Sequence, residues 1–159
     1  MLNNLINFNN LEFDFLSYPE HNWHINCSLL EARNLRMNDT EKRVLIIDPD
    51  TRERRGLTNY LKNENYDVET GKSLSEAIKK ISQGCFICLI MDVDLPEMKG
   101  YEAVSIIKNL DPQIKVIMTT KKNTKRLEAK VREQDIFFYF IKSFGKEELK
   151  LAINNAFSK

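Results

Sequence analysis

Cysteine is scarce in this chain, which has three cysteines among 159 residues, too few for a disulfide framework. Cys85 and Cys88 lie in an apolar segment typical of a strand, so we expect reduced thiols there and not a metal or redox pair. A surplus of one charge is also absent, because 24 basic and 23 acidic side chains nearly cancel. The composition therefore gives no overall field that would attract nucleic acid or a membrane surface.

Long apolar runs are absent as well, since the longest one, at 85–91, is far too short to span a bilayer. The N-terminus lacks the basic segment and apolar core that mark a signal peptide. We therefore expect a cytoplasmic protein with no nucleic-acid partner and no membrane partner. The length is that of one domain with a sizeable core.

The pattern of apolar residues from position 43 onward predicts strands and helices that alternate five times. Short runs that are apolar throughout are typical of parallel strands covered on both faces. Such alternation indicates right-handed crossovers and an α/β fold with a doubly wound, five-stranded parallel sheet and five helices. The predicted strands are 44–47, 66–70, 86–91, 114–118 and 136–141; the predicted helices are 51–63, one that a capping box opens at 73–76, 100–110, 123–132 and 146–157.

An irregular N-terminal extension, residues 1–40, precedes the predicted domain at 41–159. It is rich in Asn and aromatic residues, and we expect either a disordered arm or a docking arm. Met37 is an alternative start, because the residues after it form a typical short lead into a first strand. His21, His24 and Cys27 stand at three-residue steps, but a structural metal site wants a fourth ligand and tidier spacing.

Polar residues gather where the predicted strands end. Asp48 follows the first strand, Asp92 the third, Thr120 the fourth and Lys142 the fifth. In doubly wound folds, ligands bind at this edge of the sheet. Two carboxylates suit Mg²⁺, and an aspartate can act as a nucleophile toward phosphorus. A lysine could pair with a phosphoryl group, and a threonine hydroxyl could donate a hydrogen bond to it. The edge is therefore a candidate phosphoryl site.

This constellation resembles the receiver domain of bacterial two-component response regulators. The resemblance covers about residues 43–157 and is specific because its elements occur together and in order. They are Asp48 after the first strand, Asp92-x-x-x-Pro96-x-x-x-Gly100 at the third, Thr120 at the fourth, and Lys142-x-Phe144 at the fifth.

The resemblance implies a flavodoxin-like fold that accepts phosphate from a histidine kinase or phosphotransfer protein and is not itself an enzyme. By that match Asp92 is the phosphoacceptor and Lys142 contacts the phosphate. Mg²⁺ is held by Asp48, Asp92 and the backbone carbonyl of Asp94. Thr120 and Tyr139 match the pair that moves on activation; packing within its aromatic run is the other interpretation of Tyr139.

Three positions depart from the family pattern. Pro49 stands where a second acid normally binds the metal directly. Asp50 could replace that acid, but we favour a helix cap for it. Ser143 replaces a proline after the lysine, which makes a cis peptide bond improbable there. Lys121 replaces a small residue after the threonine and could shield the site from water or a phosphatase.

Several functions fit this pattern. The first is a stand-alone, chemotaxis-receiver-like domain that signals by protein contact, with a downstream target on the face formed by residues 121–157. The second, motivated by Pro49 and Ser143, is a degenerate adaptor that works without phosphate. The third is a haloacid dehalogenase-like phosphatase, because Asp92-Val93-Asp94 also resembles the nucleophile motif of that class. The basic run at 121–126 indicates a solvated helix face more than a nucleic-acid contact.

Overall fold

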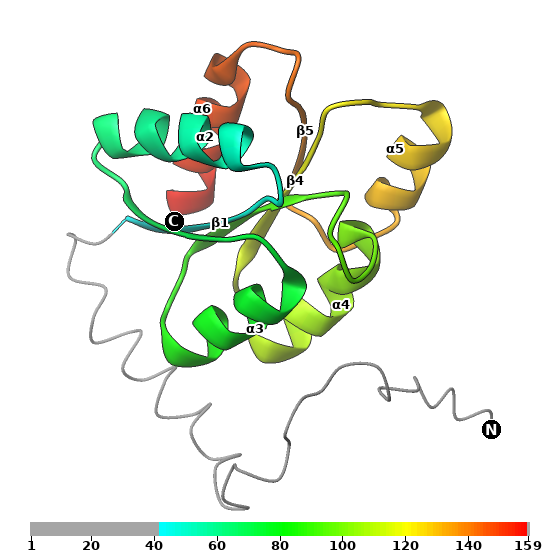
Figure 1. Ribbon diagram of the computed structural model, residues 1–159, viewed down its shortest axis with the longest axis horizontal. Coiled ribbons are helices and arrows are strands. Elements are labelled where there is room, and N and C mark those ends of the chain that lie inside the picture. The colour runs from blue at the N-terminus through cyan, green and yellow to red at the C-terminus, as the bar shows by residue number, and fades with distance from the viewer. Residues whose placement is uncertain (1–41, 159) are drawn as a thin grey trace, which may run out of the picture. The chain divides into compact units, whose positions relative to one another are not determined.

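The computed structural model describes residues 42–158, in which five strands and five helices alternate (Figure 1). The predictions for residues 1–40, including those on His21, His24, Cys27 and Met37, therefore lie outside the described residues. The elements are β1 (Arg43–Ile47), α2 (Thr51–Asn63), β2 (Asp67–Gly71), α3 (Leu74–Gln83), β3 (Cys88–Asp92), α4 (Gly100–Leu110), β4 (Lys115–Thr120), α5 (Lys125–Arg132), β5 (Phe138–Ile141) and α6 (Lys146–Phe157).

The five strands form one parallel sheet with the order β2-β1-β3-β4-β5. The chain moves outward from β1 to β2, then crosses back to β3 and continues to β4 and β5. The strand order therefore switches direction between β1 and β3, which is where ligands bind in folds of this kind. The predicted doubly wound, flavodoxin-like architecture is confirmed.

The two faces of the sheet explain why its strands are apolar throughout. Side chains alternate between faces along a strand, so Leu45 and Ile47 of β1 pack on one side while Val44 and Ile46 pack on the other. Helices α3, α4 and α5 cover the first side, and α2 and α6 cover the second. Figure 1 shows α3 and α4 opposite α2 and α6. Burial of each large apolar side chain contributes about 1.5–3 kcal/mol to this packing.

Side-chain caps mark the starts of α2, α3 and α5. Ser73 opens α3 by accepting a hydrogen bond from the N–H of Glu76 at 3.3 Å, while the Glu76 carboxylate accepts from Lys72 at 3.1 Å. The expected capping box is thus present, except that Glu76 accepts from the N–H of Lys72 and not from that of Ser73. Helix α5 begins two residues later than predicted, because Thr124 caps it by accepting from the N–H of Leu127 at 3.1 Å.

Two cysteines lie within residues 42–158. Cys88 is a fully buried free thiol, and burial raises its pKa, which keeps it protonated and unreactive. Cys85 is a half-buried free thiol. Among the described residues, none of the helices has the length and apolar character needed to cross a membrane.

Candidate functional site

Two carboxylates lie side by side at the switch in strand order. Asp48 is the residue after β1, and Asp92 is the last residue of β3. The two strands pair in parallel, with Ile47 beside Met91, so their next residues are neighbours as well. Both aspartates are buried, with 4% and 7% of their surfaces exposed. Buried carboxylates need partners, because taking a charge out of water is costly.

Lys142 is the charged partner that the two carboxylates share. Its Nζ lies 2.7 Å from Oδ2 of Asp48 and also donates to Oδ2 of Asp92. Lys142 follows β5, which lies on the far side of β4 from β3, so its long side chain reaches across the end of β4. Its main-chain N–H donates to the carbonyl of Thr120 at 2.8 Å, which fixes the start of the β5–α6 loop.

Backbone N–H groups orient the remaining carboxylate oxygens. Oδ1 of Asp48 accepts from the N–H of Asp50 at 2.8 Å, and Oδ1 of Asp92 accepts from the N–H of Asp94 at 2.7 Å. Each aspartate therefore closes a local turn just after its strand. These turns hold the carboxylates in place before any ligand binds, which is the preorganisation that a reactive site requires.

The electrostatics of the cluster are those of a buried acid pair with one cation. Burial raises the pKa of Asp92, and the nearby charge of Asp48 adds to this, while hydrogen bonds from Lys142 and Asp94 act in the opposite direction. Burial alone would lower the pKa of Lys142, but its hydrogen bonds to both aspartates outweigh burial and raise it. A second cation contacts the cluster from α2, because Nη1 of Arg54 donates to the main-chain carbonyl of Asp48 at 2.5 Å.

Asp50 does not join the two carboxylates. Its side chain caps α2 by accepting from the N–H groups of Arg52 at 2.8 Å and Glu53 at 3.2 Å. The same carboxylate pairs with Nζ of Lys121 at 2.6 Å. The hydrogen bond from Lys121 and those from the two N–H groups lower the pKa of Asp50 to about 2. The helix cap favoured from the sequence is therefore present, and the acid that Pro49 replaces has no substitute in this conformation.

The donor set still fits Mg²⁺, which accepts one or two carboxylates and keeps several waters. Asp48 and Asp92 would hold the ion, together with the main-chain carbonyl of Asp94. The side chain of Asp94 points elsewhere, because it pairs with Nζ of Lys99 at 2.5 Å. Among residues 42–158, no group of three or more acidic, histidine or cysteine side chains is assembled for a metal, so the protein would contribute few ligands.

The two candidate switch residues both contact the β4–α5 loop. The buried hydroxyl of Thr120 lies 3.0 Å from the carbonyl of Lys122 and accepts from the Lys122 N–H at 3.3 Å. The half-buried Tyr139 donates its hydroxyl hydrogen to Oδ1 of Asn123 at 3.0 Å. Thr120 is thus bonded within its own turn and Tyr139 to the same loop, so movement of this loop would involve both side chains.

Two contacts made by residues just after β3 were not predicted from the sequence. Glu97, in the β3–α4 loop, accepts from the N–H groups of Leu74 and Ser75 at 3.1 and 3.3 Å, and so caps α3 from a distance. Gly100 lies so close to the main chain of Asp92 that a Cβ there would meet its carbonyl oxygen at 2.2 Å. The position of Gly100 in the motif could be seen in the sequence. The contact between Glu97 and α3 could not, because it joins residues that are far apart in the sequence.

Ser143, which replaces the proline of the family pattern, lies in the β5–α6 loop. All peptide bonds of residues 42–158 are trans, including the one before Ser143, as the sequence predicts. The N–H of Phe144 donates to the carbonyl of Ile141 at 2.9 Å, so the loop forms a tight turn without the proline. Lys142 reaches the carboxylates from this turn.

The fold and the site together define a class of protein, namely a doubly wound domain with two acids and a lysine at its switch point. The family model of the response regulator receiver domain matches residues 44–154. The chain therefore belongs to the response regulator receiver domain family. This membership, and the place of Asp92 on the third strand of the chain, favour a signalling domain over the haloacid dehalogenase-like alternative.

Solved receiver domains resemble this chain closely in fold. The NtrC4 receiver domain, solved as a beryllofluoride-activated dimer, is 31% identical with a TM-score of 0.68, over 73% of this chain and 96% of that one. A CheY-like receiver domain protein from Methanospirillum hungatei is 27% identical with a TM-score of 0.66, over the same shares. TrrA of Thermotoga maritima, solved with Mg²⁺ and BeF, is 29% identical with a TM-score of 0.65, over 72% and 98%.

A curated relative is longer than this chain. The transcriptional regulatory protein SrrA of Staphylococcus aureus is 27% identical over 110 residues, which are 69% of this chain and 45% of SrrA. The chain thus spans less than half the length of this relative.

Proposed function

We propose that Asp92 accepts a phosphoryl group from a histidine kinase or phosphotransfer protein, and that the domain signals through protein contact. The observation that carries this proposal is the buried cluster in which Lys142 bonds both Asp48 and Asp92. Buried groups whose pKa values are shifted by desolvation and by a specific charged partner are candidates for a functional site. TrrA, a relative with the same fold, was solved with Mg²⁺ and BeF.

The chemistry is a direct displacement at phosphorus. One carboxylate oxygen of Asp92 attacks the phosphorus of the donor, a P–O bond to Asp92 forms, and the P–N bond of a phosphohistidine donor breaks. Lys142 is already within hydrogen-bond distance of Asp92, so its ammonium can neutralise charge on the incoming phosphoryl oxygens. Mg²⁺ held by Asp48 and Asp92 would supply further positive charge when bound. Water later attacks the same phosphorus, releases phosphate and restores the Asp92 carboxylate.

Signalling would begin with the hydroxyl of Thr120. A phosphoryl group on Asp92 brings acceptor oxygens to the end of β3, beside the end of β4. The Thr120 hydroxyl can then donate to phosphate instead of to Lys122, and the β4–α5 loop would rearrange. Tyr139 would follow, because its hydroxyl is bonded to Asn123 of that loop.

The downstream partner would bind the face formed by residues 121–157. This region contains α5, β5 and α6 and includes the loop that both switch residues contact. Its exposed large apolar side chains, Phe137, Phe144 and Leu151, are the kind that protein partners cover.

Intact-mass measurement after incubation with acetyl phosphate tests the proposal. Wild-type protein should gain one phosphoryl group when Mg²⁺ is present, and Asp92→Asn should gain none. Asp135→Asn is the matched control, because Asp135 is an exposed aspartate just before β5, at the opposite edge of the sheet, and it should be phosphorylated normally. Absence of an adduct in all three proteins would refute phosphorylation and would favour the phosphate-independent adaptor.

A further inference from the structure

An ion pair crosses the candidate site from one side to the other. Nζ of Lys121 lies 2.6 Å from Oδ2 of Asp50 and 3.3 Å from Oε1 of Glu53. Lys121 follows β4, whereas Asp50 and Glu53 follow β1. Strand β3 lies between β1 and β4 in the sheet, so the pair connects two loops that are about 10 Å apart and passes over the end of β3. Asp92 lies at that end.

Further bonds complete a closed ring that includes the carboxylate of Asp48. The N–H of Asp50 donates to Asp48, and the N–H of Lys142 donates to Thr120, the residue before Lys121. The Nζ of Lys142 then returns to Asp48. In this ring, only the ion pair between Lys121 and Asp50 joins two exposed side chains. It can therefore open without disturbing a strand or a helix.

Stability does not account for this ion pair. Lys121, Asp50 and Glu53 are 49%, 42% and 37% exposed, and exposed pairs of this kind contribute little to folding. The helix cap of Asp50 is complete without Lys121, because both its bonds go to backbone N–H groups. The position of the pair, over a residue that is only 7% exposed, bears on access to Asp92.

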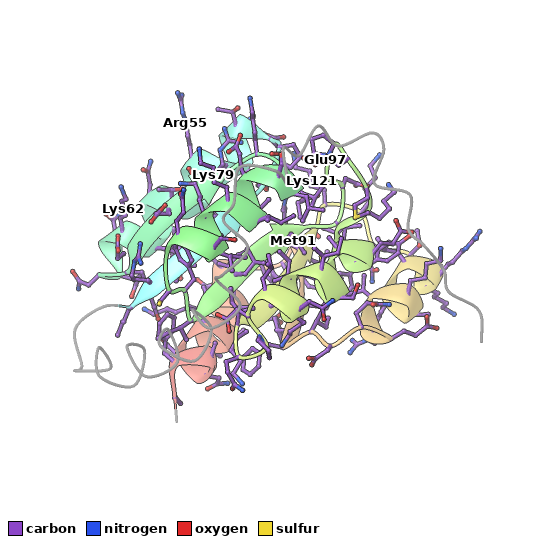
Figure 2. The ribbon with its side chains drawn as sticks, turned by 90° about the horizontal axis from the view of Figure 1, so that it is seen from below. Arg55, Lys62, Lys79, Met91, Glu97 and Lys121 are labelled. Atoms are coloured by element: carbon purple, nitrogen blue, oxygen red, sulfur yellow. The ribbon has the colours of Figure 1, made fainter. Side chains whose placement is uncertain are left out.

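We propose that Lys121, Asp50 and Glu53 form a strap that limits the approach of small phosphodonors and of water to Asp92. This inference rests on the proposed function of Asp92. When the strap is closed, the lysine side chain occupies the space above the end of β3. When it opens, a donor can reach the carboxylate, or water can attack phosphorus and release inorganic phosphate. Figure 2 shows Lys121 at the periphery of the domain, while Met91, the residue before Asp92, lies inside it.

The test compares rates of phosphorylation by acetyl phosphate and rates of phosphoryl loss after the donor is removed, both by intact mass. Lys121→Ala removes the strap, Lys121→Met keeps its bulk without charge, and Lys121→Arg keeps its charge. Lys125→Ala is the matched control, because Lys125 is an exposed lysine at the start of α5 that makes no ion pair among the described residues.

We expect both rates to rise by about two- to tenfold in Lys121→Ala and Lys121→Met, the range that one or two exposed ion pairs can produce. Lys121→Arg and Lys125→Ala should behave like wild type. Because salt screens exposed charges, high salt should bring the wild-type rates up to those of Lys121→Ala and leave that variant nearly unchanged.

Unchanged rates in Lys121→Ala would overturn the strap while leaving phosphorylation of Asp92 established. The strap would also be overturned by wild-type rates in Lys121→Met, since bulk alone would then be responsible, or by equal acceleration in Lys125→Ala. If no variant forms an adduct, the proposed function itself fails.

Discussion

Replacement of Gly100 by alanine probes how closely the start of α4 packs against the end of β3. Gly100 is the first residue of α4, and its N–H donates to the carbonyl of Val93 at 2.7 Å. A Cβ at this position would lie 2.2 Å from the carbonyl oxygen of Asp92 and 3.2 Å from Sδ of Met118. The methionine can adjust, but the carbonyl belongs to the backbone of a central strand and has little freedom to move.

The cost follows from the distance. A tolerable contact of about 3.0 Å requires the start of α4 and the end of β3 to separate by roughly 0.8 Å in a close-packed core. Overpacking usually costs about 1–3 kcal/mol, and the backbone contact places Gly100→Ala at the upper end, about 2–4 kcal/mol. With a urea m-value of about 2 kcal/mol per molar, the unfolding midpoint should fall by about 1–2 M.

Gly56→Ala is the matched control for the urea measurement. Gly56 lies in the middle of α2, and a Cβ there would have no neighbour within 4 Å. The same substitution should therefore stabilise the protein by about 0.5–1 kcal/mol, because alanine loses less backbone entropy in a helix. The reasoning is refuted if Gly100→Ala unfolds within 0.5 kcal/mol, roughly the experimental error, of wild type.

Other substitutions test other parts of the structure. Glu97→Ala removes the long-range cap of α3 and should lower the free energy of unfolding by about 1–2 kcal/mol in urea titrations. Lys142→Met leaves two buried carboxylates without their cation and should cost about 3–5 kcal/mol at neutral pH, whereas Asp92→Asn removes a buried charge and should cost far less. Lys80 and Arg43 hold the pKa of Glu69 below its ordinary value of 4.5, so the stabilisation is complete above that pH and is lost as the pH falls through the lowered pKa. Glu69→Gln should accordingly cost about 0.5–1 kcal/mol at pH 7 and almost nothing in strong acid, and an equal cost at both would contradict the ion pair.

The fold was predictable because its signals are local and periodic. Helices 51–63, 100–110 and 146–157 have the boundaries that the apolar spacing and the flanking residues indicate. The strands have the predicted positions, but each begins or ends a residue or two away from its predicted bounds. The hydrogen-bond ladder decides these ends, and neighbouring strands supply it; Asp92, for example, is counted in β3 because it pairs with Thr119 of β4.

The residues of the site that lie at strand ends could be predicted from the sequence. Asp48, Asp92 and Lys142 meet because parallel strands bring their carboxyl ends to one edge. The partners of exposed side chains were not predictable, because they join residues far apart in the sequence. Lys121 was expected near the site as a shield, but its bond to Asp50 depends on the sheet order, which sequence spacing alone does not specify.

Chemical trapping of the phosphorylated residue tests the role of Asp92 most directly. Borohydride reduces an aspartyl phosphate to homoserine, so phosphorylated protein can be reduced, digested and sequenced by mass spectrometry. Phosphorylation on Asp92 predicts homoserine at position 92 only, in samples treated with acetyl phosphate and Mg²⁺. Homoserine at position 48 or 50, or its absence from a protein that carries phosphate, would contradict the assignment of Asp92 as the acceptor.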